Sequence, residues 1–225
     1  MALNKSKGNM YTWVTHTWNP LAGKCEHNCS YCSTNRFHYP VLKDKYSGSI
    51  RICEKTLKDN LGEFNCIFVA AQNDLFASNV PDDMINRILD RCKEFTNDYL
   101  FQTKNPGRIL FFNLPESKIC TTIESNFHYW QMGNSPSPYQ RAKYMEILAE
   151  RGFETYVTIE PIMDFNLPNM VDLIKMCAPY QVNIGADSGK NNLPEPTKEN
   201  ILALIEELEK FTKVVKKSNL TRLLK

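Results

Sequence analysis

Three cysteines within eight residues constrain this chain more than any other feature of its sequence. The segment from Lys24 to Cys32 reads Lys-Cys-Glu-His-Asn-Cys-Ser-Tyr-Cys, which spaces Cys25, Cys29 and Cys32 as C-x3-C-x2-C. Thiolates this close together on a loop can all face one bound metal ion or metal–sulfur cluster. The sequence has eight cysteines, and the other five stand singly at positions 53, 66, 92, 120 and 177. We interpret those five as small buried apolar residues.

The number of cysteines in the loop separates two kinds of metal site. A structural zinc ion takes four protein ligands in a closed tetrahedral shell. An iron–sulfur cube held by three cysteines leaves one iron with an open coordination position, where a small molecule can bind. We therefore favour an iron–sulfur cluster. The alternative is a zinc-stabilised binding module in which His27 or His38 completes the shell.

Predicted strands alternate with predicted helices along the chain. Six β-rich runs, several of them as continuously apolar as strands covered on both faces must be, occupy residues 10–17, 66–71, 99–103, 119–122, 154–159 and 181–185. One predicted helix opens at Pro81. A second begins with a capping box at Ser137 and closes at Gly152, and a third carries apolar residues from about Thr197 to Val215.

This alternation predicts the fold class. Repeated strand–helix units are typical of α/β proteins in which a parallel sheet is covered by helices. A complete eight-unit barrel takes about 250 residues, and six units are visible in this 225-residue chain. We therefore predict a single domain spanning residues 1–225, folded as a partial (β/α)6 TIM-like barrel with parallel strands.

Composition excludes several other classes of protein. The 27 Lys and Arg residues nearly balance the 25 Asp and Glu residues, for a net charge of +2. Any nucleic-acid site is therefore expected to be a local patch, not a field over the whole surface. No apolar run has the length needed to cross a bilayer, and the polar first ten residues do not resemble a signal peptide. We expect a cytoplasmic protein with no membrane partner.

The cysteine spacing, directly after the first predicted strand, strongly resembles the signature of the radical S-adenosylmethionine (SAM) superfamily. Tyr31, just before the third cysteine, matches the aromatic residue that lies against the adenine of SAM in that superfamily. The resemblance implies that Cys25, Cys29 and Cys32 hold a [4Fe–4S] cluster and that SAM chelates its open iron. It implies reductive cleavage of SAM to a 5′-deoxyadenosyl radical, which abstracts hydrogen from a substrate. It also implies a one-electron donor such as flavodoxin or ferredoxin.

Polar residues follow five successive predicted strands, where a barrel would bring them together at one rim. Each could instead be a helix cap or a turn residue. By resemblance to the superfamily, some of these positions match those that contact SAM. They are Asn73 and Asp74 after the second strand, in place of the usual Gly-Gly-Glu-like segment, then Thr122, Glu124 and Ser125 after the fourth, and Gly185 and Asp187 after the sixth.

Several short motifs together resemble a narrower group, the phage- and bacterium-encoded radical-SAM-type proteins of unassigned function, distantly like spore photoproduct lyase. These motifs are Trp-Asn-Pro at 18–20, Asn-Asp-Leu-Phe at 73–76, Thr-Lys-Asn-Pro at 103–106, Ile-Glu-Pro at 159–161 and Asp-Ser-Gly at 187–189. From this resemblance we take Lys104 and Glu160 as candidate catalytic residues. The aromatic loop 126–137 suggests stacking on a base, and hence a nucleotide or nucleic-acid substrate. The alternative for this loop is a hydrophobic lid over the barrel.

Overall fold

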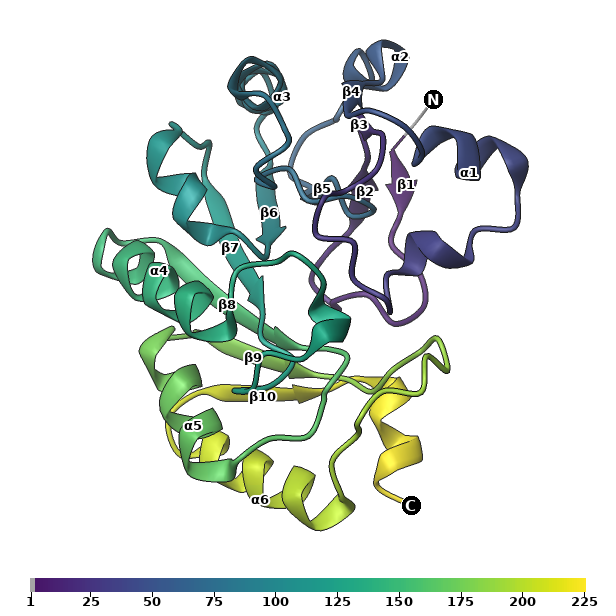
Figure 1. Ribbon diagram of the computed structural model, residues 1–225. Helices are drawn as coiled ribbons and strands as arrows, with labels where there is room; N and C mark the ends of the chain where they lie inside the picture. The colour runs from purple at the N-terminus through teal and green to yellow at the C-terminus, as the bar shows by residue number, and fades with distance from the viewer. Residues whose placement is uncertain (1–2) are drawn as a thin grey trace.

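The computed structural model describes residues 3–225, and its centre is one curved, eight-stranded sheet (Figure 1). Along the sheet the strands follow the order β1 (Asn4–Lys5), β2 (His16–Trp18), β5 (Cys66–Val69), β6 (Asp98–Thr103), β7 (Ser117–Thr122), β8 (Glu154–Ile159), β9 (Gln181–Ile184) and β10 (Lys213–Lys216). All neighbours from β2 to β10 pair in parallel, and β1 alone is antiparallel to its neighbour. Among the residues described, the two edge strands do not pair, so the barrel stays open.

Helices cover the outer side of this sheet. The longer ones are α3 (Asp82–Lys93), α4 (Pro138–Glu150), α5 (Leu167–Met176) and α6 (Lys198–Glu209), and in Figure 1 they form an outer row along the sheet. Two shorter helices, α1 (Pro40–Lys45) and α2 (Glu54–Leu57), flank a small antiparallel sheet of two strands, β3 (Leu21–Ala22) and β4 (Arg51–Ile52). The predicted α/β class with a partial TIM-like barrel is thereby confirmed.

The side chains of each strand alternate between two environments, as the period of a strand requires. On β6 to β9, residues such as Phe101, Ile119 and Val157 point outward into the main core against the helices. Their neighbours Leu100 and Cys120 belong to a second, smaller core on the concave side. Two residues further along the same inward-facing rows, Gln102 and Thr122 line a cavity at the carboxyl ends of β6 and β7.

The first predicted strand is mostly wrong. Only His16–Trp18 pairs with the sheet as β2, whereas residues 10–17 were expected to. Tyr11 and Val14 are instead buried against Phe68 and Leu100 on the concave side. The aromatic and β-branched residues of this segment fill the inside of the open barrel. A segment with that role has the same composition as a strand, so composition did not distinguish the two.

The end of the third predicted helix is also wrong. Helix α6 stops at Glu209, and residues 213–216 form β10, parallel to β9. Val215 fitted the helical spacing, but β-branched residues favour strands. The sheet therefore has seven parallel strands rather than six.

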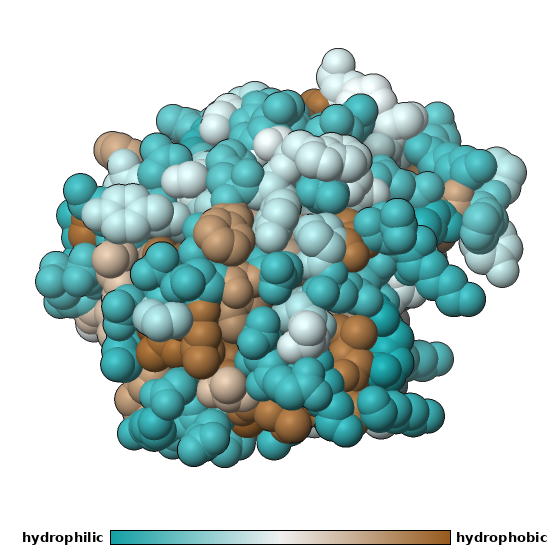
Figure 2. All heavy atoms as spheres, turned by 60° about the horizontal axis from the view of Figure 1, so that its bottom comes forward, coloured by the Kyte–Doolittle hydropathy of each residue, from teal (hydrophilic) through white to brown (hydrophobic). Residues whose placement is uncertain are grey.

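The remaining features bear on packing and surface. Cys92, Cys120 and Cys177 are buried, as expected for small apolar residues, whereas Cys53 and Cys66 are half-buried. In the part of the chain described, no helix is long and apolar enough to cross a bilayer. The face that lies at the bottom of Figure 1 is mostly hydrophilic, with small apolar patches between the polar side chains (Figure 2).

Candidate functional site

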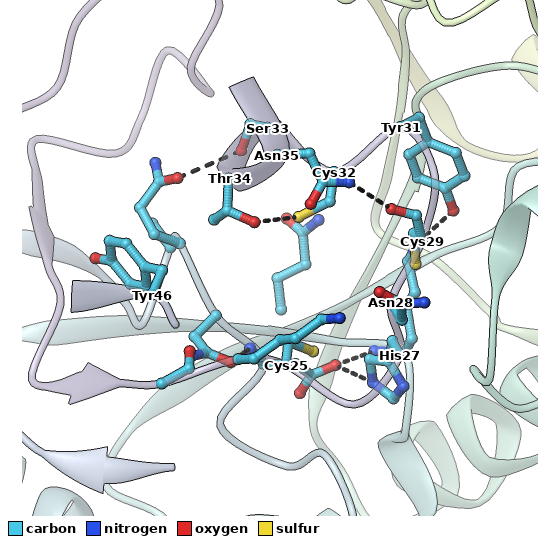
Figure 3. Close-up of a pocket in the computed structure, with 18 of the residues that line it drawn as sticks. Cys25, His27, Asn28, Cys29, Tyr31, Cys32, Ser33, Thr34, Asn35 and Tyr46 are labelled. Carbon is cyan, nitrogen blue, oxygen red and sulfur yellow. Dashed lines mark hydrogen bonds and ion pairs between the residues drawn. The ribbon is translucent and has the colours of Figure 1, made fainter. Parts of the chain in front are cut away.

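A cavity of about 330 Å³ lies between the three-cysteine loop and the carboxyl ends of β5, β6 and β7 (Figure 3). This volume is in the range of small-ligand pockets. Eight of the thirteen predicted site residues line it, namely Cys25, Cys29, Tyr31, Cys32, Asn73, Asp74, Lys104 and Thr122. The other five, Glu124, Ser125, Glu160, Gly185 and Asp187, do not.

The three cysteines stand around this cavity in different surroundings (Figure 3). Cys29 is buried, and its Sγ donates to the carbonyl of Met132 at 3.3 Å. The Sγ of Cys32 lies 3.0 Å from the hydroxyl of Thr34. Burial, aided by the negative charge of Asp74, raises the pKa of the Cys25 thiol to about 12. Cys25 therefore stays protonated at neutral pH unless a metal displaces its proton.

The spacing of these side chains differs from that of a single-ion site. In residues 3–225, no three His, Cys, Asp or Glu side chains are arranged to hold one metal ion. The ring of His27 is turned to Asp74, with Nε2 2.8 Å from Oδ2, and His38 does not line the cavity. The other ring nitrogen of His27, Nδ1, is buried without a hydrogen-bond partner, so the zinc alternative stays open. A cube, by contrast, takes each cysteine on a different iron, so its ligands need not meet at one point.

Asp74 connects the cysteine loop to the sheet through hydrogen bonds to both. Besides accepting from His27, its Oδ2 accepts from the backbone N–H of Lys104 at 2.8 Å, and its Oδ1 from that of Phe76 at 3.0 Å. Burial alone would raise the pKa of Asp74, but the hydrogen bonds and charge of His27 outweigh it and lower that pKa. Asn73 makes a second connection from the end of β5 to the segment before the cysteines, because its Nδ2 donates to the carbonyl of Gly23 at 2.9 Å.

Behind the cavity wall lies a buried network of charged groups around Glu124. Its Oε1 accepts from Lys104 Nζ at 2.7 Å and from the hydroxyl of Tyr31. Its Oε2 accepts from Arg141 Nη1 at 2.7 Å, and the side chains of Glu124 and Arg141 are both 0% exposed. Burial opposes ionisation of Glu124, but the charges of Arg141 and Lys104 hold its pKa well below the usual range.

Arg141 was not predicted as a site residue. It lies on α4, within the helix whose capping box was recognised, and it also donates to the carbonyl of Thr122 at 2.6 Å. A single arginine among the polar residues of a helix gives no sequence signal of burial. The burial of Arg141 can be recognised only from its contact with Glu124, the glutamate at the end of a strand.

Three predicted cofactor contacts do not line the cavity. Ser125 donates to the carbonyl of Asp164 at 2.6 Å and accepts from the backbone of Phe127. Asp187 accepts from the backbone N–H of Gly189 at 2.8 Å. At Gly185, an added Cβ would lie 2.7 Å from Glu160 Oε1, so this glycine allows a close approach. The turn and cap interpretation, left open above, describes Ser125 and Asp187.

Glu160 lies in a separate polar cluster. Its carboxylate accepts from Lys217 Nζ at 2.5 Å, from Asn219 Nδ2 at 2.6 Å and from Asn9 Nδ2 at 2.8 Å. It thus joins the segment before β2 to the segment after β10. The structure does not bring Glu160 together with Lys104, the other candidate catalytic residue, at the described cavity.

The aromatic loop 126–137 packs partly as a lid and partly outward. Gln131 and Met132 are buried, and the Gln131 carbonyl accepts from the backbone N–H of Ser30 at 2.9 Å. Trp130 is 78% exposed and Phe127 44%. The loop therefore supports the cysteine loop from outside while leaving two aromatic rings in solvent.

Gly133 marks the closest approach of these two loops, and Gly133→Ala should displace one of them. The glycine has a φ of +61°, and an added Cβ would lie 2.0 Å from the carbonyl oxygen of His27. We expect a loss of about 1–3 kcal/mol from backbone strain and a further loss from the clash, measured by urea unfolding. Gly8→Ala is the matched control, because its φ is +67° with nothing within 4 Å. Equal losses in the two variants would contradict this packing.

Comparisons with known proteins place this geometry in context. The structure is similar to that of a doubly substituted mutant of spore photoproduct lyase with bound AdoMet and dinucleoside spore photoproduct, with a TM-score of 0.62 and 12% identity. The similarity covers 94% of this chain and 78% of that one. At this identity the likeness establishes a shared fold. No curated protein matches the sequence. Residues 9–198 match the family described as protein of unknown function (DUF5131), and the chain therefore belongs to that family.

Proposed function

We propose that this protein is a radical SAM enzyme, with a [4Fe–4S] cluster on Cys25, Cys29 and Cys32 and SAM in the adjoining cavity. The observation that carries the proposal is that all three cysteines line one cavity at the carboxyl ends of parallel strands. In α/β barrels this end of the strands is where the chemistry is placed. The shared fold with a protein whose structure holds AdoMet supports the same conclusion.

The residues present fit such a cluster. Three sulfurs are available on one loop, and Cys29 already lies 3.3 Å from the ammonium of Lys104, which would offset thiolate charge. Bound there, such a cluster would supply the electron for cleaving the sulfonium bond of SAM, which is chemistry that side chains alone lack.

The protein's own residues would orient the ligand and exclude water. Gln102 and Thr122 are held together by a 3.2 Å hydrogen bond on the inner wall, where they offer polar atoms to a ribose. Tyr31 is fixed by Glu124 and Lys104, so its ring stays at the cavity wall. The lid residue Met132 closes the side behind Cys29.

We propose a nucleotide-like substrate for this site. The structural neighbour holds a dinucleoside, and Phe127 and Trp130 expose aromatic rings on the loop that contacts the cysteine loop. Exposed rings stack on bases with little dependence on sequence. A flavodoxin or ferredoxin is the proposed electron donor.

The test of this function is SAM cleavage by protein purified and reconstituted without oxygen. We expect 5′-deoxyadenosine and methionine after addition of dithionite, detected by mass spectrometry, and none without reductant. Protein that carries a full cluster yet leaves SAM intact under these conditions would contradict the proposal.

A further inference from the structure

The ammonium of Lys104 is held against the sulfur of one candidate cluster ligand. Its Nζ lies 3.3 Å from Cys29 Sγ and 2.7 Å from Glu124 Oε1, and it also lies 4.5 Å from the centre of the Tyr31 ring. The side chain is only 13% exposed. Its backbone is fixed as well, because the N–H of Lys104 donates to Asp74. This lysine therefore has little freedom to turn away from the sulfur.

The charges behind Cys29 do not cancel among themselves. Lys104 and Arg141 contribute two positive charges, and Glu124 between them contributes one negative charge, which leaves +1. A net charge in such a buried place is costly unless an anion faces it. Cys29 is the group that the ammonium faces beyond Glu124 and Tyr31, and as a metal ligand it would be a thiolate. Cys32, in contrast, contacts the neutral hydroxyl of Thr34.

We propose that Lys104 is a positioning residue that sets the reduction potential of the cluster through Cys29. Hydrogen bonds to the ligand sulfurs and nearby charge are two of the factors that tune such potentials. A cation on Cys29 stabilises the reduced cluster, which carries one more negative charge, and so makes reduction easier. The inference rests on the proposed function. The couple takes one electron from an added reductant such as dithionite, and no bond forms or breaks.

The experiment is a redox titration, followed by electron paramagnetic resonance, of the anaerobically reconstituted full-length protein. In Lys104→Met, the ratio of reduced to oxidised cluster at a fixed potential should fall about tenfold, which is about 59 mV for one electron. Lys104→Arg keeps the charge and should stay near the wild type. Glu124→Gln removes the negative charge beside the lysine, so its ratio should move in the opposite direction.

Lys24→Met is the matched control, because Lys24 lines the same cavity next to Cys25 but is exposed to solvent. Its charge is screened, so the ratio should change little. Equal shifts in Lys24→Met and Lys104→Met, or no shift in Lys104→Met with an intact cluster, would overturn this inference alone. If Lys104→Met fails to hold iron, the Glu124→Gln titration decides by its sign. A wild-type protein without a cluster would overturn the proposed function and this inference together.

Discussion

Cys29→Ala should lose almost all of the iron that the wild-type protein holds after anaerobic reconstitution. The wild type should hold about four irons and four sulfides per chain, and two remaining cysteines cannot keep the cube in place. Cys29 is the most buried of the three, between Met132 and Lys104, so no solvent ligand reaches its position easily. Iron and sulfide assays, with the visible absorbance of the cluster, measure this loss.

Cys66→Ala is the matched control for that variant. Cys66 is a free, half-buried cysteine at the start of β5, while the cavity lies at the other end of this strand. It should keep the full iron content. The assignment of the ligands would be wrong if Cys29→Ala kept its cluster, or if both variants lost it equally.

Arg141→Met should destabilise the protein by about 3–5 kcal/mol, the usual cost of removing one partner from a buried ion pair. The substitution leaves Glu124 fully buried with only Lys104 and Tyr31 to compensate its charge. It also removes the donor to the carbonyl of Thr122 at the end of β7. Urea unfolding followed by circular dichroism measures the change in the free energy of unfolding.

Arg87→Met is the comparison for this variant, because Arg87 pairs with Glu54 on the surface, where both side chains are about half exposed. Surface pairs contribute little, so the unfolding midpoint should not move. Similar midpoints for Arg141→Met and the wild type would show that the charged network behind the cavity is not a stabilising element.

The fold was predictable where local signals and the burial pattern agree. The capping box at Ser137 and Gln140 forms as expected, and the run at 154–159 is strand β8 with the same bounds. Sequence patterns gave wrong predictions where the same pattern is compatible with two different structures. Aromatic residues around Tyr11 fill the concave side of the sheet instead of pairing, and Val215 fits a helical spacing while lying in a strand.

The site was predictable to the extent that the ends of strands can be recognised. Asp74, Lys104 and Thr122 lie at or just after the ends of predicted strands, at positions that the resemblance singled out, and all three line the cavity. A position at the end of a strand does not say which part of the barrel rim the side chain lies on. Glu160, just after β8, was therefore grouped with them, although its carboxylate binds Lys217. Arg141 was missed because its role depends on the approach of α4 to Glu124, which no local pattern encodes.

The most direct test of the central claim is the electron paramagnetic resonance spectrum of the reduced protein before and after addition of SAM. A cube held by Cys25, Cys29 and Cys32 keeps one iron free of protein ligands. The spectrum should therefore show a reduced [4Fe–4S] cluster whose signal changes shape when SAM binds. An unchanged signal in the presence of excess SAM, or zinc bound in place of iron, would contradict the account.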